Sequence, residues 1–176
     1  MSNLIVPPNM LLRAVNDNDH EFLVDLHNDP VVLYNITNPQ PITLSQHLSW
    51  WKKVSHDRRQ LRLIFEVDNQ QAGFCKFYDI NHVNQNCVLG ADLAIQFRNR
   101  GLAKYMWQLM LITAFKGLQL HRVSLTTAEY NTVAQHVYKG LGFKEEGRLI
   151  QSLFRDGRYY DQLLMYLLTN DWNSSQ

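Results

Sequence analysis

The sequence predicts a mixed α/β fold, in which a largely antiparallel, twisted sheet is flanked by helices and includes one βαβ crossover. Three observations lead to this fold class. Strand-like and helix-like patterns follow the order strand, two helices, three strands, helix, strand, helix and two strands. An apolar helical pattern over 103–116 separates two strand-like runs, as expected of a crossover between parallel strands. The dipeptide Asp156-Gly157 joins the last two runs and is typical of a hairpin turn.

The composition is that of an ordinary globular protein. The 176 residues are expected to form a single domain over 1–176 with a substantial buried core. A net charge of +1 gives no indication of bulk binding to nucleic acid or to an anionic membrane. No apolar run approaches the ~20 residues that span a bilayer, and residues 1–8 lack the pattern of a signal peptide. Cys75 and Cys87 form no disulfide framework, so buried reduced thiols and a cytoplasmic location are expected.

The first elements are a short strand over 11–15 and a helix over 20–28, which is preceded by four residues of the types that begin helices. Asp29-Pro30 is expected to stop this helix, because the residue before a proline avoids the helical conformation. Residues 31–41 contain two further prolines and several amides and hydroxyls. They are therefore predicted to be an ordered loop between two helices.

The second helix is predicted over 44–54, because Thr43 and Gln46 match a capping box at its start. A polar cluster ends it. The three strands that follow are predicted over 61–67, 72–78 and 87–95. Gly90, inside the third strand, is expected to mark a β-bulge or a close approach of another backbone.

The stretch 95–104 links the third of these strands to the apolar helix and contains Arg98, Arg100 and Gly101. A helix N-terminus offers unpaired N–H groups and the positive end of a dipole. Glycine permits close backbone approach or a left-handed turn, and arginine adds forked donors for phosphate. Together these features predict a site for a phosphate-bearing ligand. From these residues alone, a basic turn with a solvated face is an equal alternative.

The last third of the chain begins with a strand over 122–127. Asn131 is expected to cap the next helix, which Gly140 or Gly142 ends. The two closing strands are predicted over 144–154 and 159–168.

Three segments carry a resemblance to a known enzyme family. Arg98-Asn99-Arg100-Gly101-Leu102-Ala103 fits the pyrophosphate signature Q/R-x-x-G-x-G/A, with alanine in the last position. Asn131 followed by Tyr138-Lys139-Gly140-Leu141-Gly142-Phe143 fits the segment N…Y-x-x-x-G-F, and the closing hairpin over 154–166 is the third match. By these segments and its element order, the chain resembles the GNAT superfamily of N-acetyltransferases. It is most similar to the branch of ribosomal-protein, polyamine and nucleotide-aminosugar acetyltransferases.

The resemblance implies a GNAT-like acyl-CoA N-acyltransferase fold with acetyl-CoA as co-substrate. The strand before the signature would splay from its parallel neighbour and leave backbone groups of Leu93 and Ala94 for the pantetheine arm. Asn131 would contact the same arm, and Tyr138 would be the catalytic general acid near the thioester sulfur. The pyrophosphate would lie on the N–H groups of residues 98–103, in agreement with the helix-terminus argument. The implied cofactor-binding residues are Leu93, Ala94, Arg98, Asn99, Arg100, Gly101, Leu102, Ala103, Asn131 and Tyr138.

Each of these residues also has an ordinary structural interpretation. Tyr138 fits a core tyrosine on an amphipathic helix, and Asn131 fits a simple helix cap. Arg98 and Arg100 fit surface charge. Of the signature residues, Arg98 and Gly101 are expected to contact the cofactor in preference to Arg100.

The chemistry of amine acetylation requires a base. An alkylammonium group titrates near pH ~10.4, so a side chain or a chain of water molecules must take its proton first. Asp92, Glu129 and Asp161 are the candidate side chains. Direct attack within a ternary complex is expected, without a covalent enzyme intermediate. The seven histidines contain no i,i+4 pair and no cysteine partner, so no metal site is predicted.

The acceptor pocket is expected to form from residues 34–41, Trp50, Trp51 and 154–160. Residues 31–41 contain no carboxylate, which argues against a polyamine, because several ammonium groups need matching negative charge. Aromatic and amide side chains together with Arg155 and Arg158 instead favour a nucleotide-linked aminosugar.

The leading acceptor is therefore a small-molecule primary amine of the aminosugar type, with a protein N-terminus or a polyamine as the alternative. A non-catalytic acyl-CoA-binding module is the alternative from another class, and the presence of Tyr138 argues against it. Exposed edges on the closing hairpin would allow a homodimer, and a monomer is equally consistent.

Overall fold

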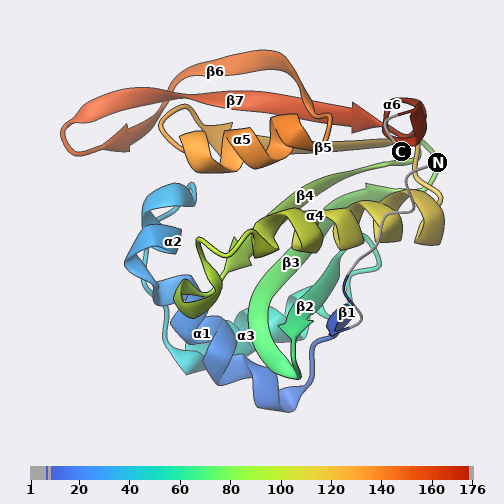
Figure 1. Ribbon diagram of the computed structural model, residues 1–176. Helices are drawn as coiled ribbons and strands as arrows, with labels where there is room; N and C mark the ends of the chain where they lie inside the picture. The colour runs from blue at the N-terminus through green and yellow to red at the C-terminus, as the bar shows by residue number, and fades with distance from the viewer. Residues whose placement is uncertain (1–6, 8, 175–176) are drawn as a thin grey trace.

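The fold is organised around a seven-stranded sheet, seen in a computed structural model that describes residue 7 and residues 9–174 (Figure 1). The strand order is β1-β2-β3-β4-β5-β7-β6, and every neighbouring pair is antiparallel except β4 and β5. The strands are β1 (Met10–Ala14), β2 (Leu61–Val67), β3 (Gln70–Asn81), β4 (Asn86–Leu93), β5 (Arg122–Ala128), β6 (Lys144–Arg155) and β7 (Arg158–Leu168). The predicted mixed, largely antiparallel sheet with one crossover is confirmed. The expectation for residues 1–8 lies outside the described residues, except at residue 7.

The helices flank this sheet. They are α1 (His20–Asn28), α2 (Pro30–Asn35), α3 (Leu44–Val54), α4 (Leu102–Ile112), α5 (Thr132–Gly140) and α6 (Thr169–Ser174), with short turns η1 (Asp17–Asp19), η2 (Ile95–Phe97) and η3 (Thr113–Gly117). Figure 1 shows α4 crossing β3 and β4, and α5 lying along β5 and β7. Both helices begin on the side of the molecule where α2 lies. None of the helices within the described residues is long and apolar enough to cross a membrane.

The predicted loop over 31–41 is partly wrong, because its first residues belong to α2. Asp29 does avoid the helical conformation, with ψ at 129°, so α1 ends there as expected. Its carboxylate then accepts hydrogen bonds from the N–H groups of Val31 and Val32, at 3.0 and 3.1 Å. Pro30 stands at the first helical position, where its missing N–H has no cost. The same two residues therefore end one helix and begin the next.

The sheet divides between β4 and β5. Their parallel pairing is confined to three positions, from Asn86 opposite Arg122 to Val88 opposite Ser124. Beyond Val88, β4 continues to Leu93 with β3 as its partner on one side. Gly90 pairs in register with Lys76, so the strand has no bulge at that position. The edge of β4 that faces β5 is left open over its second half.

The core confirms several expectations from the sequence. Phe65, Phe77 and Met110 are among the fully buried side chains that join the sheet to α4. Cys75 and Cys87 are buried free thiols, and burial raises the pKa of Cys87 to about 12. The short helix α6 was not predicted from the sequence.

Candidate active site

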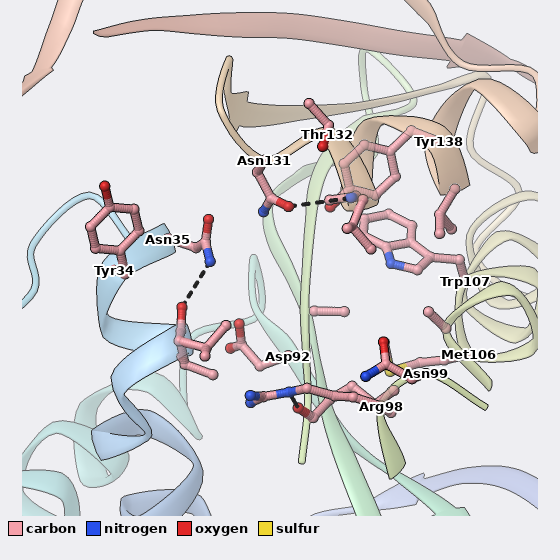
Figure 2. Close-up of a pocket in the computed structure, with 18 of the residues that line it drawn as sticks. Tyr34, Asn35, Asp92, Arg98, Asn99, Met106, Trp107, Asn131, Thr132 and Tyr138 are labelled. Atoms are coloured by element: carbon pink, nitrogen blue, oxygen red, sulfur yellow. Dashed lines mark hydrogen bonds between the residues drawn. The ribbon is translucent and has the colours of Figure 1, made fainter. Parts of the chain in front are cut away.

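A cavity of about 710 Å³ lies where β4 and β5 separate, and α2, the start of α4 and the start of α5 complete its walls (Figure 2). Six of the ten residues expected to bind the cofactor line it: Leu93, Arg98, Asn99, Ala103, Asn131 and Tyr138. The structure therefore brings together residues from three separate elements that the sequence analysis had grouped. Ala94, Arg100, Gly101 and Leu102 are not in the lining, and the side chains of Ala94 and Leu102 are buried.

The open edge of β4 offers one of the two expected backbone donors. The N–H of Ala94 donates to the carbonyl of Ala72 at 2.9 Å, so it is already used within the sheet. Neighbouring residues of a strand point their N–H groups to opposite sides. The N–H of Leu93 therefore points away from β3 and toward the cavity. Of the pair predicted from the sequence, Leu93 is available and Ala94 is not.

The start of α4 has the geometry of an anion site. Gly101 is the N-cap residue, with φ at +73° and no side-chain cap. The first N–H groups of α4 therefore have no partner within the helix, and the dipole directs positive potential toward the cavity. A Cβ added at Gly101 would meet no atom within 4 Å, so the left-handed backbone, rather than space, explains the glycine. The N–H of Arg98 already donates to Ile95 at 3.2 Å, which leaves the donors from residue 99 onward.

The side chain of Arg98 is held by protein acceptors instead of pointing freely at the cavity. Its Nε donates to the carbonyl of Leu93 at 2.8 Å, and a terminal nitrogen donates to Asp29 at 2.9 Å. Arg100 is exposed, and its guanidinium lies 5.6 Å from the centre of the Phe97 ring. Arg98 nevertheless lines the cavity and Arg100 does not, so the expected preference for Arg98 over Arg100 as a cofactor contact stays a prediction.

Asn131, the N-cap of α5, and Tyr138, within α5, both lie at the opposite wall of the cavity (Figure 2). The side-chain oxygen of Asn131 accepts from the N–H of Ala134 at 3.2 Å, so Asn131 is a helix cap that also lines the cavity. The ring of Tyr138 packs edge-on against Trp107, with centroids 4.8 Å apart. Burial, and then the charge of Asp92, raise the pKa of Tyr138. Its hydroxyl keeps its proton at neutral pH, and within the described residues it has no hydrogen-bond partner.

Only one of the three candidate bases lines the cavity. Asp92 does so, and it is paired with Lys76 through a contact of 2.6 Å. Glu129 instead accepts from the N–H of Asp161 at 3.0 Å, while Asp161 accepts from the N–H of Gln151 at 2.8 Å. These two carboxylates stabilise the end of β5 and the distorted part of β6, outside the cavity lining.

Helix α2 forms a wall of the cavity where the sequence predicts a loop, and Tyr34, which is expected at the acceptor pocket, is part of that wall. The hydroxyl of Tyr34 donates to Asp156 at 2.6 Å, and the bond raises the pKa of Tyr34 to about 12. Arg155 donates to the carbonyls of Tyr34 and Ile36, at 3.1 and 2.6 Å. The capping potential of Asp29-Pro30 was the one local signal for this helix.

The arginines of the hairpin are therefore not free for a nucleotide. Arg155 is engaged by α2, and Arg158 hydrogen-bonds to the hydroxyl of Tyr160 and lies over its ring. The structural support for a nucleotide-linked aminosugar is lost with them.

A second cavity of about 350 Å³ adjoins the first through Asp92, which lines both. Its other walls are Leu23, Leu26, His27, Ile42, Gln46, His47, Trp50, Phe74 and Lys76. Trp50 is thus at a cavity, as expected, while Trp51 packs against His20 with centroids 5.5 Å apart. Among the described residues there is no group of three or more side chains suited to hold a metal ion.

The known proteins to which the chain is similar are acetyltransferases. Residues 9–144 match the family described as Acetyltransferase (GNAT) domain. The chain is 27% identical over 165 residues to a spermidine N(1)-acetyltransferase of Vibrio cholerae serotype O1, covering 93% of this chain and 95% of the relative. It is 24% identical over 126 residues to a putative ribosomal N-acetyltransferase of Bacillus subtilis, covering 72% and 69%.

Solved structures extend the comparison. The crystal structure of spermidine N-acetyltransferase from Vibrio cholerae in complex with CoA and spermine superposes with a TM-score of 0.89 at 25% identity, covering 95% of this chain and 99% of that one. A dodecameric structure of spermidine N-acetyltransferase from the same organism gives a TM-score of 0.84 at 26% identity, covering 97% and 100%.

Proposed function

This chain belongs to the GNAT family of acetyltransferases, and we propose that it transfers the acetyl group of acetyl-CoA to a primary amine of an aliphatic polyamine. The observation that carries the choice of acceptor is the similarity, over 93% of this chain, to a spermidine N(1)-acetyltransferase. The aminosugar acceptor expected from the sequence is not supported, because neither these relatives nor the engaged hairpin arginines favour it.

The residues of the larger cavity suit acetyl-CoA. The free N–H of Leu93 on the open edge of β4 suits the amide-bearing pantetheine arm, and the amide of Asn131 faces the same space. The N–H groups from residue 99 into the first turn of α4 suit a pyrophosphate. When bound, acetyl-CoA supplies an activated acetyl thioester.

Two side chains are proposed to handle protons. Tyr138 carries its proton at neutral pH, as an unperturbed tyrosine also does, so it can donate that proton to the departing thiolate sulfur. Asp92 is the carboxylate that borders both cavities, and Lys76 fixes its position. We propose that Asp92 attracts the incoming ammonium group and passes its proton to water, since it is the acid nearest the cavity. Holding the two reactants together then supplies much of the acceleration.

One observation favours a second class of acceptor. Among the described residues, the walls of both cavities contain a single carboxylate, Asp92, and Lys76 already balances its charge. An acceptor with one amine, such as a protein N-terminus, needs no further negative charge. This is the alternative to the polyamine.

Release of free CoA thiol from acetyl-CoA in the presence of different amines tests the proposal. Spermidine and spermine are expected to give turnover well above that with an aminosugar nucleotide. Turnover with short peptides alone would support the protein N-terminus instead. Tight CoA binding without turnover of any amine would identify a non-catalytic acyl-CoA-binding module and contradict the proposal.

A further inference from the structure

We propose that the Arg98–Asp29 ion pair is a positioning element that couples acetyl-CoA binding at the start of α4 to the ordering of α2. The inference rests on the proposed function, because it takes acetyl-CoA to occupy the larger cavity. Arg98 and Asp29 are positioning residues in this account, since the reacting atoms lie elsewhere in the cavity.

The fork of Arg98 joins two walls of the cavity. Its Nε holds the carbonyl of Leu93 at 2.8 Å, and its terminal nitrogen holds Asp29 at 2.9 Å. The two side chains of the pair are only 19% and 13% exposed, so solvent screens the contact weakly. Figure 2 shows Arg98 extending from the α4 side toward the helices at the N-terminal end of the chain. A lysine has no second donor in such a fixed fork and cannot make both contacts together.

The carboxylate oxygen of Asp29 that accepts from Arg98 also accepts two backbone hydrogen bonds. That oxygen caps α2 by accepting from the N–H groups of Val31 and Val32. Burial alone would raise the pKa of Asp29, but hydrogen bonds from Arg98 and from these N–H groups outweigh it and lower the pKa. The carboxylate therefore stays charged at neutral pH, and it ties Arg98 directly to the first turn of the helix.

Helix α2 depends on hydrogen bonds from other elements at its two ends. Six residues are too few for a helix to be stable alone, so its order comes from tertiary contacts. Its far end is held by Arg155 of the hairpin, which donates to the carbonyls of Tyr34 and Ile36. It is also held by Tyr130, between β5 and α5, whose hydroxyl donates to the carbonyl of Tyr34 at 2.7 Å. Arg98 holds the start of α2 in the same way, through its ion pair with the N-cap residue Asp29.

The coupling follows from this arrangement. The N–H of Leu93 and the loop that carries Arg98 are the parts of the chain suited to hold acetyl-CoA, and Arg98 is fixed to both. Ordering them therefore orders Asp29 and the α2 residues that line the acceptor side, Val31, Tyr34 and Asn35. By linkage, an acceptor that binds against α2 should bind more tightly once CoA is present.

Asp29→Asn separates the ion pair from the helix cap. Asparagine caps helices about as well as aspartate, so the bonds to Val31 and Val32 remain while the charge is lost. Asp29→Ala loses both. Glu146→Gln is the matched control, because Glu146 pairs with Arg122 at 2.6 Å and neither residue lines the cavity. Arg98→Lys is the second variant, in case Asp29→Asn does not fold.

Hydrogen exchange with and without CoA provides the readout that does not depend on turnover. In the unmodified protein and in Glu146→Gln, CoA is expected to protect the amides of residues 31–35 as well as those of residues 102–104. In Asp29→Asn and Arg98→Lys, protection of 102–104 should persist and that of 31–35 should be lost. Equal protection of 31–35 in all variants would overturn the proposal.

Steady-state kinetics give the second readout. Asp29→Asn should raise the KM for the amine roughly five-fold or more, while the Kd for acetyl-CoA from calorimetry stays within about two-fold. A weaker Kd for acetyl-CoA with an unchanged KM for the amine would place the pair in cofactor binding and overturn the coupling. If the unmodified protein binds CoA but acetylates no amine, the proposed function fails, and hydrogen exchange still decides the coupling.

Discussion

At the scale of single residues, Tyr138 carries the clearest chemical expectation. Tyr138→Phe removes the hydroxyl and keeps the ring that packs on Trp107. We expect kcat to fall by about 100-fold or more, since that is the usual contribution of a general acid, with the affinity for acetyl-CoA unchanged. Steady-state kinetics and calorimetry measure the two quantities.

Tyr105→Phe is the control for this change. Tyr105 lies on α4 and does not line the cavity, so its loss of a hydroxyl should leave kcat as it was. A Tyr138→Phe protein with full kcat would exclude the general-acid role.

The roles of residues were predictable from the sequence where the signal is local. Gly101 adopts a positive φ at a helix start, and Asn131 is a cap, because both depend on the residues beside them. The partner of Arg98 was not predictable, since Asp29 is 69 positions away in the chain. For the same reason, the sequence offered Arg155 as a substrate contact, while folding places it against α2.

At the scale of elements, the start of α4 makes a prediction about stability. Gly101→Ala puts a Cβ on a backbone with φ at +73°, without any clash. The left-handed conformation alone should lower the free energy of unfolding by about 1–2 kcal/mol. Any relaxation of that backbone would also weaken the binding of CoA, which calorimetry measures.

Gly140→Ala provides the comparison. Gly140 lies in α5 with nothing within 4 Å of its added Cβ and no positive φ, so alanine should maintain or increase stability there. Urea unfolding of both variants tests the difference. If Gly101→Ala and Gly140→Ala changed the free energy of unfolding equally, the left-handed backbone would not be the reason for a glycine at position 101.

Elements were predictable where they are long or carry paired signals. The capping box of Thr43 and Gln46 placed the start of α3, and a strand-like run between two polar clusters placed β2. Helix α2 was missed because six residues cannot display a helical period. The separation of β4 from β5 is a property of two strands together, and neither sequence contains it. That is why the family resemblance, and not periodicity, led to the expected splay.

At the scale of the whole molecule, a buried histidine pair makes stability depend on pH. The ring nitrogens of His20 and His47 lie 3.0 Å apart between α1 and α3. Burial, and then the neighbouring His20, lower the pKa of His47 from 6.5 to about 4. The unfolded chain therefore binds a proton that the folded protein resists. The contribution is fully present above about pH 6.5 and is lost as the pH falls toward 4, by up to about 3 kcal/mol.

Urea unfolding between pH 4 and 7.5 measures this loss. His47→Gln should reduce the dependence on pH, while His56→Gln, at an exposed position, should leave it unchanged. An identical slope in the His47→Gln protein would assign the pH dependence to other groups. The expected cytoplasmic location and the choice between a homodimer and a monomer stay predictions at this scale, and one structure of a similar protein is dodecameric.

The short seam between β4 and β5 has a mechanical consequence. In the part of the chain that the structure describes, three residue pairs join β4 to β5, fewer than at any other strand boundary. We therefore expect β4 and β5 to separate more easily than any other pair of neighbouring strands, with residues 86–88 acting as the hinge. At the other end of the cavity, the hydrogen bonds of Arg155 and Asp156 to the α2 region connect the two parts of the molecule. A ligand that binds between β4 and β5 should therefore limit this hinge motion, so the rigidity of the protein should depend in part on whether the cavity is occupied.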